Sequence, residues 1–265
     1  MKKGGRPLSR KKQSHLEPSW TGPRPVIKST AEKRVKRWLA NADTKHPAQS
    51  VEGSFTENIN WRIFRIMAEF VEGFEFLSTL NKEVSIFGSS VVTSSNKYYQ
   101  LAKEIGYLCG KNGFTVVTGG GPGMMEAANW GAYDAGGESV GLDISLPLEQ
   151  RRNAYVKRAM GFHYFFTRKV MLSASSQAYV FMPGGFGTLD ELFEIVTLIQ
   201  TRKMSDEVPV ILVGRAFWHP MLVWIERVLM EEYQFLNEDA FKILRVVDTA
   251  EEAFAIIKKT HERIL

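Results

Sequence analysis

The sequence predicts an α/β protein with a doubly wound, mainly parallel sheet, helices on both faces and an N-terminal helical extension. Short apolar runs alternate with amphipathic helical patterns through most of the chain. The runs are nearly continuous in Val, Ile and Phe, which is typical of strands buried on both faces. Loops rich in small residues follow three of these runs, where such sheets bind ligands. The expected architecture is therefore Rossmann-like.

Residues 1–50 are predicted to be a basic, largely disordered tail. They contain 13 Lys or Arg and 3 Asp or Glu, a balance of +10, so residues 51–265 carry 21 basic and 26 acidic groups, or −5. Gly, Pro and Ser are scattered through the tail and large apolar residues are few. We interpret it as a solvated arm and expect no nucleic-acid partner, since the rest of the chain lacks interleaved aromatic and basic residues.

Residues 51–265 are predicted to form one nucleotide-binding catalytic domain that begins with a helix over 56–80. The SFTE sequence at 54–57 is a capping box for this helix. Apolar residues then recur every three or four positions, which predicts one buried stripe. The stripe consists of Ile59, Ile63, Ile66, Met67, Phe70, Phe74 and Leu77.

Six apolar runs are predicted to be strands, and every run except the third is followed by a helical pattern. The runs are EVSIF (83–87), FTVVT (114–118), ESVGLDI (138–144), AYVFM (178–182), VPVILVG (208–214) and ILRVV (243–247).

Three loops are candidates for ligand binding: FGSS (87–90), TGGGPGMM (118–125) and MPGGFGT (182–188). Glycine lets a ligand approach the backbone closely, and the helix start behind it offers unpaired N–H groups and a positive dipole end. These features favour an anion such as phosphate. The loops match neither GxxxxGK[ST] nor GxGxxG, which disfavours ATP hydrolysis and ordinary NAD chemistry.

The third loop leads into a helix whose first turns carry acidic residues. If Thr188 begins this helix, Glu191 lies about one turn further in, at the mouth of the site. Asp190 is rotated by about 100° and points away from Glu191, so we interpret Asp190 as an ordinary acid near a helix N-terminus.

Three segments carry a resemblance to a known family. PGGFGTLDE (183–191), GGGPGMME (119–126) and FHYFFTRKVML (162–172) resemble the motifs of the LOG ("lonely guy") cytokinin-activating enzymes, in particular the longer bacterial members. The resemblance implies a phosphoribohydrolase that converts a purine nucleoside 5′-monophosphate, with adenine or an N6-modified adenine, to free base and ribose 5-phosphate. It also implies that Arg168 and Glu191 are the catalytic pair.

The loops and the resemblance together predict the residues that bind substrate and phosphate. These are Gly88, Ser89, Gly119, Gly120, Gly121, Gly123, Met124, Lys169, Pro183, Gly184, Gly185, Gly187 and Thr188. In one departure, Val91 stands where longer members carry an arginine.

No cofactor and no metal are expected. Older naming describes such proteins as lysine decarboxylases, but the chain shows no evident pyridoxal phosphate site. Its five histidines form no HExxH motif and no cluster with cysteine. His163 lies in the apolar run FHYFF, which predicts a buried core histidine.

Two alternatives remain open. One is a non-catalytic nucleotide-binding or carrier protein with the same loops. The other is a dinucleotide oxidoreductase, in which Asp143 would bind a ribose.

The resemblance implies a homodimer or a higher homo-oligomer, and FEIVTLIQ (193–200) offers an apolar stripe for a partner. No apolar run is long enough to span a membrane, so the cytoplasm is the expected compartment.

Overall fold

The computed structural model describes residues 33–35, 37, 59–145, 152–174, 176–237 and 239–263. The chain divides into two compact units, Met1–Gln49 and Ser50–Leu265. In the first unit the described residues are helical. The second unit contains the sheet and the predicted site.

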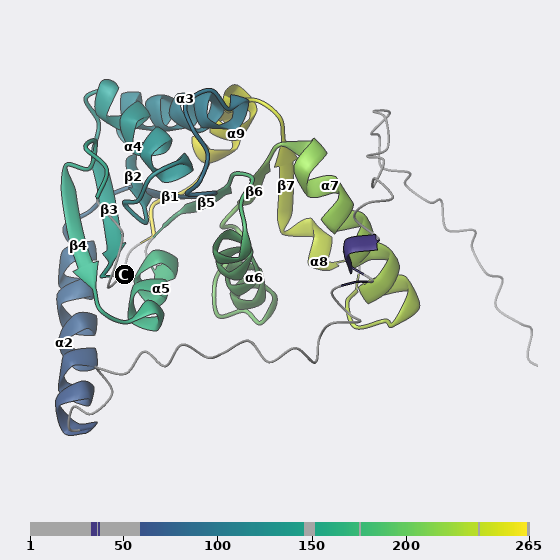
Figure 1. Cartoon of the computed structure of the whole chain (residues 1–265), viewed down its shortest axis with the longest axis horizontal. Helices are drawn as coiled ribbons and strands as arrows, with labels where there is room; N and C mark the ends of the chain where they lie inside the picture. The colour runs from purple at the N-terminus through teal and green to yellow at the C-terminus, as the bar shows by residue number, and fades with distance from the viewer. Residues whose placement is uncertain are drawn as a thin grey trace, which may run out of the picture. The chain divides into compact units, whose positions relative to one another are not determined.

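The sheet has seven strands, all parallel, in the order β4-β3-β2-β1-β5-β6-β7 (Figure 1). The chain winds outward from β1 to β4, returns to the centre and winds outward again from β5. This arrangement confirms the doubly wound fold and places the reversal of strand order between β1 and β5. The strands are β1 Glu83–Phe87, β2 Thr115–Thr118, β3 Ser139–Ile144, β4 Arg158–Phe162, β5 Ala178–Phe181, β6 Val210–Val213 and β7 Leu244–Val247.

Helices cover both faces of the sheet (Figure 1). One face carries α3 Lys97–Lys111, α4 Met124–Asp134 and α9 Ala250–Ile257. The other carries α2 Ile59–Leu77, α5 Phe165–Ala174, α6 Phe186–Gln200 and α7 Arg215–Trp224. The π-helical segment η1 Ile225–Glu232 continues α7, and the short α8 Asp239–Lys242 precedes β7.

Each face of the sheet has its own hydrophobic core. In β5, Ala178 and Val180 pack beneath α3 and α4, whereas Tyr179 and Phe181 pack beneath α5 and α6. Successive side chains of a strand point to opposite faces, so a strand buried on both sides is expected to be apolar at most positions. The continuous apolar runs of the sequence follow from this double burial.

The sequence did not predict β4, which forms one edge of the sheet. Of its residues, RAMGF, only Phe162 is buried; the first three are half-buried and Gly161 is exposed. An edge strand needs no continuous apolar run, because one side of it has no neighbouring strand. The usual sequence signal for a buried strand is therefore missing here.

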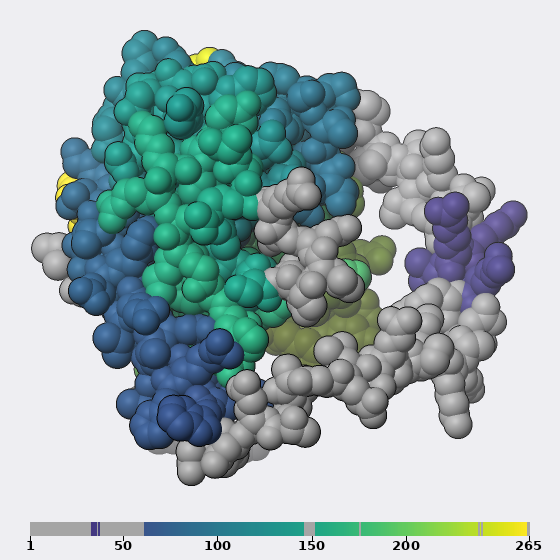
Figure 2. Space-filling model, turned by 60° about the vertical axis from the view of Figure 1, so that its left-hand side comes forward, coloured from purple at the N-terminus to yellow at the C-terminus, as the bar shows by residue number. Residues whose placement is uncertain are grey.

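Helix α2 also differs from its prediction. Its predicted start at residue 56 and the capping box at 54–57 lie outside the described residues. The helix buries Glu69, Gly73 and Leu77, whereas Met67, from the predicted apolar stripe, is 56% exposed. This helix, in dark blue at the lower left of Figure 2, therefore presents apolar side chains to solvent.

None of the helices in the described part of the chain is both long enough and apolar enough to cross a membrane.

Candidate functional site

The three predicted loops meet at the centre of the sheet, because they follow the adjacent strands β2, β1 and β5. Backbone hydrogen bonds join them directly. Ser89 N donates to Pro183 O at 3.1 Å, and Met124 N donates to Ser89 O at 2.9 Å. Loops that are about 30 to 95 residues apart in the sequence therefore form one wall at the point where strand order reverses.

A cavity of about 570 Å³ lies over these loops, a size typical of small-molecule sites. Nine of the predicted site residues line it: Gly88, Ser89, Gly119, Arg168, Lys169, Gly185, Gly187, Thr188 and Glu191.

The other six predicted residues do not line this cavity; all are buried except the half-buried Gly184: Gly120, Gly121, Gly123, Met124, Pro183 and Gly184. The Met124 side chain is fully buried in the core. A Cβ on Gly184 would lie 2.0 Å from Thr188 Oγ1, so the glycine allows the Thr188 side chain to pack there. Met125, which was not predicted, reaches the cavity in place of Met124.

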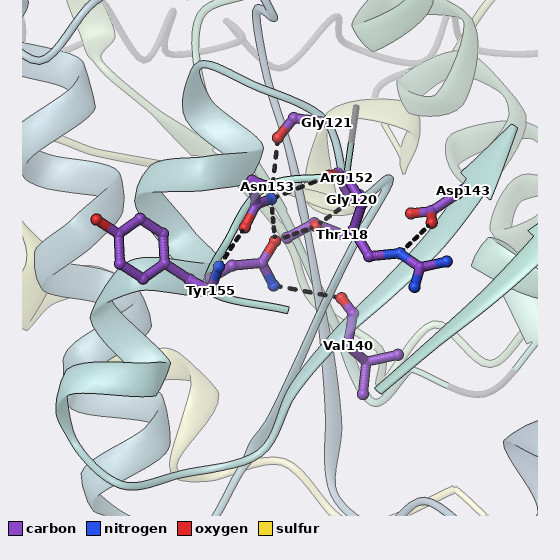
Figure 3. Close-up of polar contacts among 9 residues, drawn as sticks. Thr118, Gly120, Gly121, Val140, Asp143, Arg152, Asn153 and Tyr155 are labelled. Carbon is purple, nitrogen blue, oxygen red and sulfur yellow. Dashed lines mark hydrogen bonds and ion pairs between the residues drawn. The ribbon is translucent and has the colours of Figure 1, made fainter. Parts of the chain in front are cut away.

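A buried polar network holds the loop between β2 and α4 (Figure 3). Asn153 Nδ2 donates to the carbonyl oxygens of Gly120 and Gly121, both at 3.0 Å. Gly120 N donates to Thr118 Oγ1 at 2.9 Å, and the Thr118 hydroxyl donates to Asn129 at 2.6 Å. Sequence reasoning missed Asn153, because it follows a different strand and no local motif includes it.

Asp143 packs against the same loop. Its Oδ2 accepts a hydrogen bond from Arg152 Nε at 2.6 Å (Figure 3). Gly120 has a φ of +70°, and a Cβ there would lie 1.9 Å from Asp143 Oδ1. Burial raises the pKa of Asp143, opposed by Arg152 and Arg168. Asp143 does not line the cavity, and its Oδ2 is engaged by Arg152, whereas its Oδ1 is buried without a hydrogen-bond partner among the described residues.

Glu191 lies in the first turns of α6 and is only 7% exposed. Its Oε2 is buried and has no hydrogen-bond partner among the described residues. Burial raises the pKa of Glu191 to about 7, although Arg168 and Lys169 act in the opposite direction. A carboxyl group that ionises near neutral pH at a cavity wall is suited to exchanging a proton with a ligand or with water.

Arg168 lies in the first turn of α5, and Glu191 and Asp143 are its electrostatic neighbours. Burial lowers its pKa, whereas the two carboxylates raise it. Its Nε is buried without a hydrogen-bond partner among the described residues. The guanidinium therefore keeps donor capacity for a ligand.

Lys169 links α5 to α6. Its Nζ lies 2.8 Å from Asp190 Oδ1 and 3.0 Å from Glu194 Oε2. The Asp190 side chain is 65% exposed, and it forms this ion pair at the rim while Glu191 is buried. The two acids thus have the different environments that helix geometry predicted.

The mouth of the cavity is more apolar than the sequence predicted. Phe165, Phe166, Phe186 and Val91 all line it, and Phe186 and Val91 are 92% and 86% exposed. The prediction of a buried His163 is wrong, because this residue is exposed at the turn before α5. In a sequence, apolar residues next to a glycine loop look like part of the core. Only the fold shows that these four side chains lie at the opening of the cavity.

Within the described ranges, no group of three or more His, Cys, Asp or Glu side chains is arranged to hold a metal ion.

Comparisons with known proteins show which family the chain is similar to. Residues 125–257, just over half of the chain, match the family described as "Possible lysine decarboxylase". The chain is 28% identical to the cytokinin riboside 5′-monophosphate phosphoribohydrolase LOG of Oryza sativa subsp. japonica over 176 residues, which cover 64% of this chain and 70% of the relative. It is 26% identical to the cytokinin riboside 5′-monophosphate phosphoribohydrolase of Rhodococcoides fascians over 155 residues, which cover 57% of this chain and 78% of the relative.

A similar solved structure, the X-ray structure of TM1055, aligns with a TM-score of 0.51 and 28% identity. The alignment covers 67% of this chain and 99% of the solved one, so the shared part includes nearly all of that smaller fold. The family match and the fold together show that the chain belongs to the family described as possible lysine decarboxylases, the LOG family.

Proposed function

We propose that the protein hydrolyses the N-glycosidic bond of a purine nucleoside 5′-monophosphate, with adenine or an N6-modified adenine as the base. The relatives reported above are named phosphoribohydrolases, and this chain belongs with these enzymes. The observation that carries the proposal is the buried Glu191 carboxyl group near Arg168, in a cavity walled by glycine loops; its Oε2 has no hydrogen-bond partner in the described part of the chain.

The start of α6 is the proposed phosphate site. Gly185 occupies the N-cap position and provides no side-chain hydrogen bond, so nothing in the cap competes with a ligand for the first N–H groups. The N–H groups and the helix dipole together favour a phosphate group. Gly185, Gly187 and Thr188 all line the cavity at this point.

Cleavage then needs a carboxylate beside the anomeric carbon, because the sugar develops positive charge as the base leaves. We assign this role to Glu191, which also accepts a proton from the attacking water. The oxygen of that water forms the new bond to C1′, and the electron pair of the broken C–N bond leaves with the base, which gains a proton. Arg168 is always charged and can bind ribose hydroxyls or phosphate in a fixed orientation.

The apolar mouth is the proposed binding region for the base. Phe165, Phe166 and Phe186 offer aromatic surfaces on which a flat purine can stack. Val91 adds apolar surface and no charge, which suits an uncharged base or an apolar N6 substituent.

The test is incubation of the purified protein with AMP or adenosine, followed by chromatography for free adenine and ribose 5-phosphate. AMP should be cleaved and adenosine should be a far poorer substrate, because the phosphate contacts hold the sugar in place. Equal rates on both compounds would contradict the proposal. Binding of AMP without release of adenine would favour the alternative of a non-catalytic carrier.

We also propose that the protein forms a homodimer or a larger homo-oligomer. The segment 193–200 is a weak candidate for the interface, because Ile195 and Ile199 are buried in the core. The exposed apolar face of α2 is a better one; it consists of Trp61, Ile63, Phe64, Met67, Val71 and Phe74. Sedimentation should show a smaller species for Met67→Glu than for the wild type.

The cytoplasm remains the compartment expected from the sequence.

A further inference from the structure

The start of α5 is anchored by a residue from another helix. Glu69, on α2, is buried at 8% exposure, and its Oε1 accepts a hydrogen bond from His163 N at 2.7 Å. Its Oε2 accepts from Thr167 Oγ1 at 2.5 Å and from Tyr164 N at 3.4 Å. These donors precede or belong to the first turn of α5, where backbone N–H groups have no partner within the helix.

The Glu69 carboxylate, about 95 residues away in the sequence, therefore anchors the start of α5 through two N–H groups just before the helix and one hydroxyl in its first turn. A negative charge at this end of a helix is also favoured by the helix dipole. Within the sequence of α5 there is no acidic residue in the first turn that would do the same.

A second contact holds the two helices close together one turn further along α2. A Cβ on Gly73 would lie 2.6 Å from Met171 Sδ, so the absence of a side chain lets α5 approach α2. Glu69 and Gly73 are four residues apart and share one face of α2. Together they set the position of α5 at its start and at its middle.

Arg168 directly follows Thr167 in the sequence, and its Nε forms no hydrogen bond with any described residue. The place of the guanidinium beside Glu191 therefore depends on where the first turn of α5 lies. Thr167 is completely buried and bonds to Glu69, so the backbone that carries Arg168 is anchored through this pair.

We propose that Glu69 is a positioning residue for Arg168: α2 holds the first turn of α5 through the Glu69 carboxylate, and so places the guanidinium next to Glu191. Glu69 is not among the residues that line the cavity. The N-terminal extension of the fold thus takes part in building the site.

The test compares Glu69→Gln with Glu72→Gln, a control on the exposed face of the same helix. In Glu69→Gln, hydrogen exchange measured by mass spectrometry should become faster in the segment 162–172, and kcat for AMP should fall about 10- to 100-fold. KM should change less than kcat, because the phosphate site on α6 is intact. The control should match the wild type in all three measurements.

A double-mutant cycle with Arg168→Ala separates positioning from a general loss of structure. If Glu69 acts through Arg168, adding Glu69→Gln to the Arg168→Ala variant should lower kcat by less than about 2-fold. Equal losses in both backgrounds, or wild-type exchange in 162–172, would overturn the proposal. Should Glu69→Gln fail to fold, Thr167→Val removes only the hydroxyl contact, and Thr167→Ser should restore both exchange and kcat.

The measurement of kcat rests on the proposed function, whereas the measurement of hydrogen exchange does not. If the wild-type protein released no base from AMP, the proposed function would fail. The exchange rates of 162–172 in the two Glu variants would still decide whether Glu69 holds α5.

Discussion

At the scale of single residues, Glu191 and Asp190 are chemically alike and adjacent, but their environments differ. Glu191 is buried against Arg168, and Asp190 is exposed and paired with Lys169. We predict that Glu191→Gln lowers turnover of AMP by at least about 100-fold, because an amide can neither accept a proton from water nor balance the positive charge on the sugar. Calorimetry should show that the variant still binds AMP.

The matched control is Asp190→Asn, which should keep most of the activity. Lys169 retains Glu194 as a partner in that variant. A Glu191→Gln enzyme with a rate near the wild type would remove Glu191 from the proposed mechanism.

The raised pKa of Glu191 predicts the pH dependence of turnover. Because burial brings this pKa to about 7, the ionised form is lost as pH falls below that value. This pKa belongs to the ligand-free protein, so kcat/KM for AMP, which reports ionisations of the free enzyme, should fall about tenfold per pH unit below 7 and level off above it. A kcat/KM that is constant between pH 5 and pH 8 would show that the reaction does not require the carboxylate.

The same raised pKa predicts an effect on stability. The pKa of Glu191 is about 7 in the folded protein and 4.5 as its ordinary value. The protonated group therefore stabilises the folded state fully only below pH 4.5, and this contribution is lost as the pH rises through 7. Glu191→Gln avoids burying a charge, so it should unfold at a higher temperature than the wild type at pH 8. The difference should shrink at pH 5; a difference independent of pH would contradict the assignment.

At the scale of elements, the loop between β2 and α4 has a shape that depends on glycine. Gly120 and Gly136 have similar φ values, +70° and +74°, but only at Gly120 would a Cβ clash, 1.9 Å from Asp143 Oδ1. Gly136→Ala should therefore cost only the backbone strain of about 1 kcal/mol.

Gly120→Ala should cost clearly more than Gly136→Ala and should also weaken AMP binding, because the clash pushes the loop away from Asn153. Chemical denaturation of the two variants gives the comparison. Equal losses of stability would mean that the contact with Asp143 relaxes without cost.

The helices around the site each contribute a different part. α6 supplies Glu191 and the proposed phosphate site, and α5 supplies Arg168. Lys169 joins the two helices through Asp190 and Glu194, and α2 holds α5 from the other side through Glu69. A shift of α5 would therefore change the distance between the proposed catalytic residues without unfolding the sheet.

At the scale of the whole molecule, the charge is divided between the tail and the rest of the chain. Deletion of residues 1–50 removes a balance of +10 and changes the net charge from +5 to −5. We predict that the shortened protein folds and keeps its activity and its association, since Ser50–Leu265 forms a compact unit and contains every proposed site residue.

Circular dichroism, AMP turnover and sedimentation of the shortened protein are the measurements. Loss of folding would show that the tail has a structural role, and an active monomer would contradict the proposed oligomer.

Much of this protein follows from its sequence alone. Six of the seven strands were predicted. Five of them are interior strands whose burial on both faces favours nearly continuous apolar residues, and the edge strand β7 was recognised from the short apolar run ILRVV. The glycine loops were predicted to lie at one edge, because parallel strands have their carboxyl ends on the same side. Glu191 was distinguished from Asp190 by the rotation of a helix alone. All three are local patterns or consequences of simple geometry.

The tertiary structure decided what depends on contacts between distant segments. β4 is an edge strand with mostly half-buried or exposed residues, so its sequence shows no strong apolar pattern, and Asn153 reaches Gly120 across 33 positions of sequence. Glu69 anchors the start of a helix that begins 96 residues after it. The pKa of Glu191 rises because α5 and the loops around it exclude water, although the neighbouring cations favour ionisation. Burial of a charge is a property of the assembled fold, and no stretch of sequence contains it.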